Sequence, residues 1–378
     1  TAATTATIDG GAGADIVNGS NGGDTLTLTT VESVAAGTGN DSITADGSLT
    51  NATLNGGVDT LTLTAATTAT IDGGAGADIV NGSNGGDTLA LTTVESVAAG
   101  TGNDAITADG TLTNAQLNGG QDTLTLNGAA TTATIDGGAG NDIVNGSANG
   151  DTLSLTTVES IVGGAGADAI TADAALVSAL LGGGTDALTY TASLTATVDG
   201  GAGADTLTLA GGADVITVND VEVVNMGSGG SDTLIVQAGS ALTTVNGFTS
   251  GDDKFVNATE TGGAFATITA AGTNVGANQD VIEIENSVGV VADLTNTAQV
   301  DALIANAVGN ITFGDTFTVV VYSGGDAGIY TFDSGVDAGA LGNYEAGEGT
   351  VTHIATLSGV GTNALVGGDV FHSVDNVA

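Results

Sequence analysis

The sequence predicts an all-β fold: a parallel β-solenoid with coils of about 18 residues, followed by a mostly β C-terminal segment with one helix. Three observations predict it. A block of about 63 residues recurs, because the run Thr5–Asp9 returns at Thr68, at Thr132 and, less well preserved, at Thr195. Within each block, Asp residues follow one another at steps of 9 or 17 to 20. Between them, glycine-rich turns alternate with short runs of Thr and aliphatic residues.

Each nine-residue unit predicts one short strand and one turn. The runs Asp24–Leu28 and Asp59–Leu63 both alternate Thr with Leu after the Asp, which is typical of a strand with one buried face. Gly, Asn and Asp fill the turns. Two units therefore make one coil with two strands, flattened into two sheets. Turns eighteen residues apart are expected to stack on one edge of the solenoid, and turns nine apart to lie on opposite edges.

Five turns share one motif, Gly-Gly-x-Gly-x-Asp, followed two residues later by an aliphatic residue. Glycine lets the backbone turn sharply and point carbonyl oxygens inward, while one Asp per turn adds charge without bulk. Ca²⁺ takes about six to eight oxygen ligands, so this combination of carboxylates and carbonyls suits it. The five windows are residues 10–17, 73–80, 137–144, 163–170 and 200–207.

This motif resembles the nonapeptide of the RTX (repeats-in-toxin) calcium-binding parallel β-roll family. The resemblance implies that Asp carboxylates and backbone carbonyls of the turns coordinate several Ca²⁺ ions between successive coils. The implied carboxylate ligands are Asp15, Asp24, Asp41, Asp59, Asp78, Asp87, Asp104, Asp122, Asp142, Asp151, Asp168, Asp186, Asp205, Asp214 and Asp232. The implied glycine ligands are Gly11, Gly13, Gly74, Gly76, Gly138, Gly140, Gly164, Gly166, Gly201 and Gly203.

Several turns depart from the motif. The turns that end at Asp24 and Asp87 lack the second Gly, the turn that ends at Asp59 lacks the first two, and Asn149 replaces the third Gly before Asp151. An isolated turn of this kind could be a simple capped turn in which the Asp bonds its own backbone. The common register of the whole set favours calcium.

The spacing also predicts on which edge each Asp lies. A block of 63 residues contains seven units of nine, and because seven is odd, consecutive blocks place their Asp on opposite edges. The opposite edge of each block is expected to hold ion-free turns such as residues 47–50. We expect Asp24, Asp41, Asp59 and Asp78 on one edge, Asp87, Asp104, Asp122 and Asp142 on the other, and Asp151, Asp168, Asp186 and Asp205 on the first again.

Two further acidic sets are left off the ligand list. A repeated Val-Glu-Ser motif is interpreted as a solvated strand face, with extra ligands or lattice contacts as the alternative. An Asp directly before the first Gly of a motif is expected to brace the turn. The first set is Glu32, Glu95, Glu159 and Glu222, and the second is Asp9, Asp72, Asp136 and Asp199.

Aromatic residues separate the last third from the rest. All seven Phe and three of the four Tyr follow residue 247, so we place a boundary near Val245, with a solenoid domain at 1–245 and a capping and assembly domain at 246–378. Val300, Leu303 and Ile304 recur at helical spacing within a helix expected over 296–308. Strands are expected over 265–269, 281–285, 315–322, 328–332 and 351–357.

Composition excludes several partners. The 378 residues include 43 Asp and Glu but only one Lys or Arg, Lys254, for a formal net charge of −42. Nucleic acid and anionic membranes attract Lys and Arg, so neither is expected as a partner. No apolar run is long enough for membrane insertion, and without Cys there is neither a disulfide framework nor a thiolate site. Self-repulsion at neutral pH calls for cations.

We expect a secreted, extracellular or cell-surface location. A secretory signal peptide has a basic segment and an apolar core, and the start of the chain has neither. The chain begins inside a repeat, which suggests a longer parent protein. RTX proteins carry a C-terminal signal for type I secretion, and the acidic tail ending at Ala378 is similar. Calcium is expected to drive folding, and acidification to unfold the chain.

The function expected is structural rather than enzymatic. His353 and His372 have no metal-site spacing to a second His, and Lys254 is expected only in a local ion pair. The near-identical blocks favour a regular structural protein, resembling RTX-type surface-layer (S-layer) proteins, that self-assembles with copies of itself into a lattice or filament, with cell-surface polysaccharide as a further partner. The alternative is an RTX adhesin, or the calcium-binding secretion module of a larger enzyme.

Overall fold

The structure is a computed structural model. It describes residues 2–237, 240–250, 252–258, 264–268, 279–284, 291–307, 316–333, 349–361, 365 and 370–372. The chain divides into two compact units, residues 1–191 and 192–378, which are described separately. The boundary predicted near Val245 lies inside the second of these units and stays a prediction.

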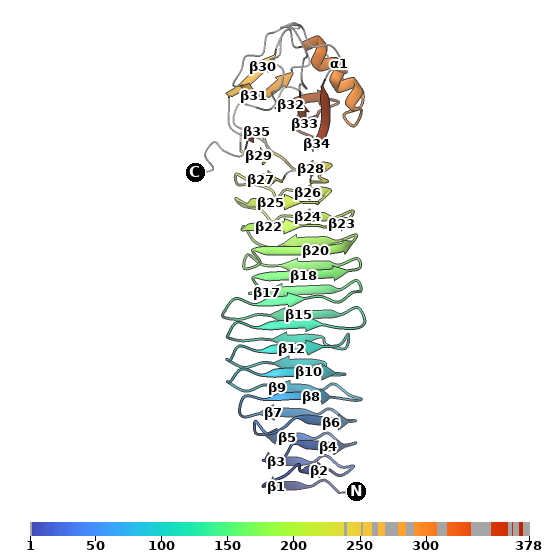
Figure 1. Cartoon of the computed structure of the whole chain (residues 1–378), viewed down its shortest axis with the longest axis vertical. Helices are drawn as coiled ribbons and strands as arrows, with labels where there is room; N and C mark the ends of the chain where they lie inside the picture. Colours follow the sequence, from blue (N-terminus) through green and yellow to red (C-terminus); the bar gives the residue numbers. More distant parts are fainter. Residues whose placement is uncertain are drawn as a thin grey trace. The chain divides into compact units, whose positions relative to one another are not determined.

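The first unit is a parallel β-solenoid with two sheets, and each coil contributes one strand to each sheet (Figure 1). All the strand pairs within each sheet are parallel, as between β1 and β3 or β2 and β4. Sheet 1 contains β1 (Thr5–Asp9), β3 (Thr25–Thr29), β5 (Ser42–Ala45), β7 (Thr60–Leu63), β9 (Ile79–Asn81), β11 (Ser96–Ala98), β13 (Asn114–Gln116), β15 (Thr132–Asp136), β17 (Thr152–Thr156), β19 (Ala169–Ala172) and β21 (Ala187–Tyr190). Sheet 2 contains β2 (Ile16–Asn18), β4 (Ser33–Gly37), β6 (Asn51–Asn55), β8 (Thr68–Asp72), β10 (Thr88–Thr92), β12 (Ala105–Ala108), β14 (Thr123–Leu126), β16 (Ile143–Asn145), β18 (Ser160–Ala165) and β20 (Ser178–Gly184).

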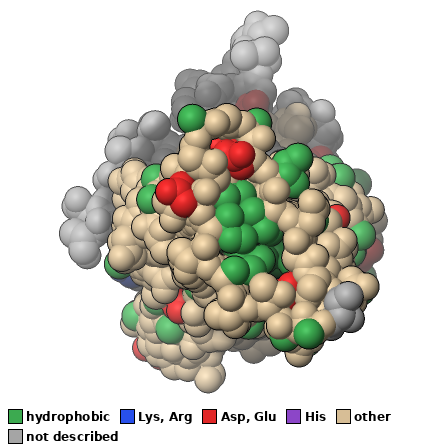
Figure 2. Space-filling view, turned by 90° about the horizontal axis from the view of Figure 1, so that it is seen from below, with side chains coloured by type: hydrophobic (Ala, Val, Ile, Leu, Met, Phe, Trp, Pro, Cys, Tyr) green, Lys and Arg blue, Asp and Glu red, His purple; other side chains and the backbone are tan. Residues whose placement is uncertain are grey.

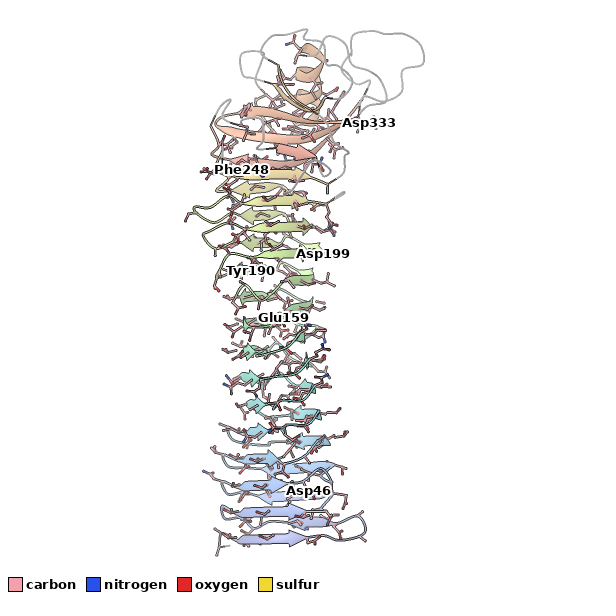
Figure 3. All side chains as sticks on the ribbon, turned by 90° about the vertical axis from the view of Figure 1, so that its left-hand side faces the viewer. Asp46, Glu159, Tyr190, Asp199, Phe248 and Asp333 are labelled. Atoms are coloured by element: carbon pink, nitrogen blue, oxygen red, sulfur yellow. The ribbon has the colours of Figure 1, made fainter. Side chains whose placement is uncertain are left out.

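The core of this unit follows from the alternation of Thr with aliphatic residues. In β3, Leu26 and Leu28 are buried while the three Thr side chains are exposed, and side chains project in the same regular way from coil to coil (Figure 3). One aromatic residue enters this narrow core: Tyr190 in β21 is 2% exposed. Tyr190 is the one Tyr that precedes residue 247.

The predicted alternation between edges is confirmed. We call the turns that precede sheet 1 strands the first edge, and those that precede sheet 2 strands the second edge. Asp24 to Asp78 directly precede β3, β5, β7 and β9, on the first edge, and Asp87 to Asp142 precede β10, β12, β14 and β16, on the second. Asp151, Asp168 and Asp186 return to the first edge, before β17, β19 and β21.

Each edge of the first unit therefore repeats a cycle of seven turns. Four consecutive turns end in Asp, the fifth in Glu, the sixth in a buried Leu and the seventh in Thr. On the first edge, the cycle after Asp78 continues through Glu95, Leu112 and Thr131. The Leu turns are the ones predicted to be ion-free, and the absence of ions there stays a prediction. Leu49 is fully buried, and Asp46 closes its turn by accepting hydrogen bonds from the amide and hydroxyl of Ser48.

The end of the unit at β1 and β2 leaves part of the core in view. Figure 2 shows hydrophobic side chains gathered inside the ring of backbone at this end. Ala6, Ile8, Val17 and Leu26 line a small pocket there, together with polar groups of Ser20 and Asp24.

The second unit contains further parallel coils. One sheet is built from β22 (Thr195–Asp199), β25 (Val215–Asn219), β27 (Thr233–Val236), β29 (Lys254–Asn257) and β35 (Val370–His372). The other is built from β24 (Thr206–Thr208), β26 (Val223–Asn225), β28 (Thr244–Asn246) and β34 (Thr350–Ser358). Strand β23 (Ala202–Gly203) precedes β24. Because β34 and β35 pair with the last solenoid strands, the C-terminal segment caps this stack, as predicted.

The capping region contains the predicted helix and strands with small shifts. Strands β30 (Ala264–Ile268), β31 (Gln279–Ile284) and β32 (Thr316–Ser323) are parallel, whereas β33 (Asp326–Asp333) runs antiparallel to β32 and β34. The helix α1 spans Thr297–Ala307, so the predicted end at 308 lies outside the described residues.

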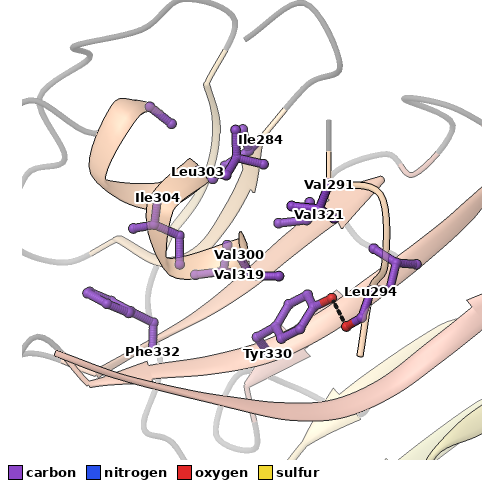
Figure 4. Close-up of a cluster of buried hydrophobic side chains, with 11 residues drawn as sticks. Ile284, Val291, Leu294, Val300, Leu303, Ile304, Val319, Val321, Tyr330 and Phe332 are labelled. Carbon is purple, nitrogen blue, oxygen red and sulfur yellow. Dashed lines mark hydrogen bonds between the residues drawn. The ribbon is translucent and has the colours of Figure 1, made fainter. Parts of the chain in front are cut away.

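The helix packs on the capping sheet through the residues that its spacing indicated. Val300, Leu303 and Ile304 are buried in one cluster with Val319, Val321, Tyr330 and Phe332 (Figure 4). The hydroxyl of Tyr330 donates a hydrogen bond to the carbonyl of Leu294 at 2.5 Å. Among the described residues, no helix combines the length and apolarity that a membrane span requires.

Candidate metal centres

The predicted Asp ligands occupy equivalent positions, each in the turn that leads into a strand. All of them from Asp24 to Asp232 are at most 2% exposed, although carboxylates are rarely buried without compensation. Asp15, in the first coil, is half-buried. The sequence therefore predicted the location of these carboxylates correctly, and their burial needs an explanation.

Hydrogen bonds connect these carboxylates into ladders along each edge. The amide of Asp24 donates to Oδ1 of Asp41 at 2.6 Å, the amide of Asp41 to Oδ1 of Asp59 at 2.7 Å, and the amide of Asp59 to Oδ1 of Asp78 at 2.8 Å. We call this set the first ladder. The second ladder joins Asp87, Asp104, Asp122 and Asp142 in the same way at 2.6 to 2.9 Å.

Glu residues end these ladders, which corrects our interpretation of them as a solvated strand face. The amide of Asp78 donates to Oε2 of Glu95 at 2.7 Å, and the amide of Asp142 to Oε2 of Glu159 at 2.7 Å. Glu32 and Glu222 accept from Asp15 and Asp205 in the same way. Asp and Glu differ in side-chain length, so the Glu carboxylate reaches the same backbone amide from a turn of different shape.

The remaining oxygen of the later Asp residues has no protein partner. Oδ2 is buried and without a hydrogen bond in Asp41, Asp59 and Asp78, and likewise in Asp104, Asp122 and Asp142. A buried carboxylate oxygen without a donor is costly, and such atoms are rare in native proteins. A cation at this oxygen would remove the cost, so the carboxylates fit a metal.

Backbone carbonyls supply the second kind of oxygen. The turns of successive coils approach so closely that a β-carbon on Gly76 would overlap the carbonyl oxygen of Gly57, and a β-carbon on Gly57 would overlap that of Gly39. Positive φ angles of 157° at Gly76 and 137° at Gly57 also require glycine. These carbonyl oxygens thus point along the stack, beside the Asp ladder.

The first glycine of each complete motif packs directly against its Asp. A β-carbon on Gly73 would lie 2.8 Å from Oδ2 of Asp78, and one on Gly137 would lie 2.8 Å from Oδ2 of Asp142. All ten glycines predicted as ligands have positive φ angles. The motif thus specifies a backbone path that only glycine follows, as well as a set of oxygen atoms.

Burial raises the pKa of several ladder Asp residues, as expected for buried carboxylates without a bound cation. Desolvation raises the pKa of Asp59 to about 6 and the pKa of Asp104 to about 7. Desolvation also raises the pKa of Asp41 and the pKa of Asp122. Hydrogen bonding from the amide of Ser20, by contrast, lowers the pKa of Asp24.

Taken together, the donors fit Ca²⁺. Within the described ranges, no three acidic or His side chains gather around one point, so a site must take most of its ligands from the backbone. Ca²⁺ accepts backbone carbonyls and carboxylates in flexible geometry, and a turn with one Asp and several carbonyls provides them. When bound, the ion would neutralise the carboxylates and join adjacent coils.

Three of the four Asp residues that precede the motifs, Asp9, Asp72 and Asp136, brace the turns as expected, and for Asp199 this stays a prediction. Oδ1 of Asp72 accepts a hydrogen bond from the hydroxyl of Thr93, which in turn accepts one from the amide of Gly74. Thr93 has a φ of 50°, an unfavourable value for a β-branched residue. Asp9 with Thr30 and Asp136 with Thr157 repeat the arrangement.

Two features of the ladders were missed from the sequence. Asp253 is 3% exposed and extends the ladder of Asp214 and Asp232, since the amide of Asp232 donates to its Oδ1 at 2.9 Å. Its spacing of 21 residues from Asp232 is the signal that could have found it. The second feature is a Ser cap on the first Asp of three ladders, formed by Ser20, Ser83 and Ser147.

Comparison with known proteins agrees with this geometry. A model of the RTX calcium-binding nonapeptide repeat matches four segments, residues 7–26, 70–89, 134–153 and 196–220. No match was found among curated proteins. The first three segments each contain a pair of turns on opposite edges, such as those of Asp78 and Asp87. The chain therefore contains four segments of RTX calcium-binding nonapeptide repeats, which form part of a parallel β-solenoid.

Proposed function

We propose that the protein is a secreted, calcium-dependent structural protein that self-assembles into a cell-surface layer or an extracellular filament. The observation that carries the proposal is the repetition of one ladder with the same contacts. Asp41–Asp59–Asp78–Glu95 and Asp104–Asp122–Asp142–Glu159 agree to within 0.1 Å in each amide-to-carboxylate distance. Such regularity favours a role for the periodic surface itself rather than for one unique pocket.

Calcium supports this role by neutralising charge. A chain with a net charge of −42 repels itself and its copies at neutral pH. Ions bound inside the turns reduce this repulsion within one molecule, and ions shared between molecules would do the same across an interface. Because the unfolded chain has no preformed site, the binding free energy contributes to folding.

The surface of the described residues favours a non-catalytic role. A shallow groove of about 580 Å³ crosses β15, β17 and β19, and its lining consists of Thr, Ser, Ala and Leu residues such as Thr134 and Ser154. His353 lies in β34, where its ring faces Tyr330 at a centroid distance of 5.2 Å and its Nε2 is 3.1 Å from the hydroxyl of Thr356. Neither place unites an acid, a base and a nucleophile.

The RTX repeats also support an extracellular location. Such repeats are typical of proteins exported by type I secretion. Ca²⁺ sites made from few carboxylates and many carbonyls are weak enough to stay empty at low cytosolic calcium and to fill outside the cell. Because calcium is low in the cytosol and higher outside the cell, the chain would fold after export.

Electron microscopy of the purified chain tests the proposal. Addition of millimolar Ca²⁺ should produce ordered sheets or filaments, and chelation should dissolve them. Mg²⁺ at the same concentration is the matched control, since it demands near-octahedral geometry and keeps its water ligands. Folded monomers in Ca²⁺ at every protein concentration would contradict self-assembly and favour the adhesin or secretion-module alternative.

A further inference from the structure

The Asp residues of one ladder fall into two chemical environments, and the difference lies in how many donors reach the carboxylate. In Asp24, Oδ2 accepts a hydrogen bond from the amide of Ser20 at 2.5 Å, and Oδ1 accepts from the hydroxyl of Ser20 and the amide of Thr4. Both oxygens of this first Asp are therefore occupied by donors.

The same cap recurs at the start of the next two ladders, whereas Asp214, the first Asp of the last ladder, has a buried Oδ2 without a donor. Ser83 donates its amide to Oδ2 of Asp87 at 2.7 Å and its hydroxyl to Oδ1 at 3.2 Å. Ser147 repeats both bonds to Asp151, at 2.7 and 3.1 Å. By contrast, the three later Asp of the first and second ladders have an Oδ2 without any donor, although each of these side chains is at most 2% exposed.

The backbone changes at the same point of the stack. Between the second, third and fourth coils of the first ladder, the carbonyl oxygens of Gly39 and Gly57 point at the glycine of the next coil. Between the first and second coils, Gly39 instead faces the carbon and nitrogen of the Gly22–Gly23 peptide, whose oxygen lies farther away.

The second ladder shows the same change. The carbonyl oxygens of Gly102 and Gly120 point at Gly120 and Gly140, whereas Gly102 faces the Gly85–Gly86 peptide bond. The orphan carboxylate oxygens and the aligned carbonyls of Gly39 and Gly102 thus begin together, one coil after the Ser cap, although the carbonyl oxygens of Ser20 and Ser83 already point at Gly37 and Gly100. These are the two kinds of ligand that Ca²⁺ requires.

We propose that, in the first and second ladders, calcium binds only at the three later Asp, and that the first, Ser-capped Asp is a structural residue that starts the ladder without an ion. The ions would lie at Asp41, Asp59 and Asp78 in the first ladder and at Asp104, Asp122 and Asp142 in the second. Asp24, Asp87 and Asp151 already have a full set of donors, and a cation there would have to displace the amide of the Ser. This assignment rests on the proposed calcium-dependent function.

Calcium content of matched variants tests the assignment. The full-length chain and its variants are equilibrated with buffered Ca²⁺, and bound calcium per chain is measured by mass spectrometry of the metal. Asp59→Asn and Asp122→Asn should each lose at least one ion per chain. Asp24→Asn and Asp87→Asn, which keep the side-chain shape, should retain the content of the unchanged chain. Equal losses in both classes would overturn the assignment.

Two further measurements keep the test decisive if a capped variant folds poorly. Ser83→Ala removes the hydroxyl bonds to Asp87 and to the backbone of Gly85, keeps the amide bond to Asp87, and should leave the calcium content unchanged. A crystal structure with anomalous scattering should place ions at Asp104, Asp122 and Asp142, and an ion on Oδ2 of Asp87 would contradict the assignment. Absence of bound calcium in the unchanged chain would instead refute the proposed function itself, so the two failures are distinguishable.

Discussion

The stack of turn glycines offers a quantitative test of how tightly the coils approach, because two glycines share a motif position but differ in what lies beneath them. Gly76 and Gly13 are both the third glycine of a complete motif, with φ angles of 157° and 137°. A β-carbon on Gly76 would overlap the carbonyl oxygen of Gly57, whereas one on Gly13, in the first coil, would meet nothing within 4 Å. Ala at either site carries the same backbone penalty, and only Gly76→Ala adds a clash.

The expected magnitudes follow from these two contributions. The positive φ costs Ala about 1–2 kcal/mol at either position. The overlap at Gly76 adds about 1–3 kcal/mol, because a packed stack relaxes only by shifting a coil. Gly76→Ala should also displace a carbonyl oxygen that we assign to the ion column, so its loss of stability should be larger in Ca²⁺ than in chelator.

Urea unfolding followed by circular dichroism, with and without saturating Ca²⁺, measures the difference between the variants. Gly140→Ala repeats the test in the second ladder, where the carbonyl oxygen of Gly120 occupies the same place. If Gly76→Ala and Gly13→Ala lose equal stability, the close approach of the turns is wrong, and with it the argument for a carbonyl column.

Three other predictions concern protons, the ion-free turns and the ladder ends. Burial raises the pKa of Asp59 to about 6 and that of Asp104 to about 7, above the value of about 3.9 in an unfolded chain. The calcium-free protein should therefore gain stability as the pH falls from about 7 to about 4, and lose that stability as the pH rises through these folded pKa values. Denaturant titrations in chelator measure this change, and a loss of stability on acidification would contradict the prediction. The calcium-loaded protein should behave oppositely because protons displace the ion, so acid unfolding stays a prediction for that form only. Leu112→Ala should destabilise the chain by about 2–5 kcal/mol through the cavity it leaves, without changing the calcium content; an altered ion count would show that the Leu turns are not ion-free. Glu95→Ala should cost about 1–3 kcal/mol of stability by leaving the buried amide of Asp78 without an acceptor, whereas Glu95→Gln should retain most of the stability. Thermal melts that rank the two variants the other way would contradict the role of Glu95 as the residue that ends the ladder.

The architecture of the solenoid could be predicted because its information is local and repeated. Alternation of Thr and Leu specifies the buried face of a strand such as β3, and the steps between Asp24, Asp41 and Asp59 specify which turns stack. An odd number of nine-residue units per block then determines which edge each Asp joins. None of these steps requires knowledge of a contact between distant residues.

The parts that could not be predicted depend on geometry between coils. Glu95 was interpreted as solvated because Glu is usually exposed, but its carboxylate reaches the amide of Asp78 in the preceding coil. The Ser83 cap on Asp87 depends on the path of one turn, and Gly-Ser-Asn-Gly-Gly does not reveal that path by composition. Tyr190 enters a core that the neighbouring strands fill with smaller side chains.

One block of 63 residues spans three and a half coils, so an internal duplication has an unusual geometric effect. Insertion of a single block into the first unit would turn every downstream ladder to the other side of the molecule, while insertion of two blocks would restore the original side. Chains that differ by an odd number of blocks would thus present the same turns in opposite directions. Binding of a partner that recognises one edge would therefore depend on whether the number of blocks is odd or even, and not only on the length of the chain.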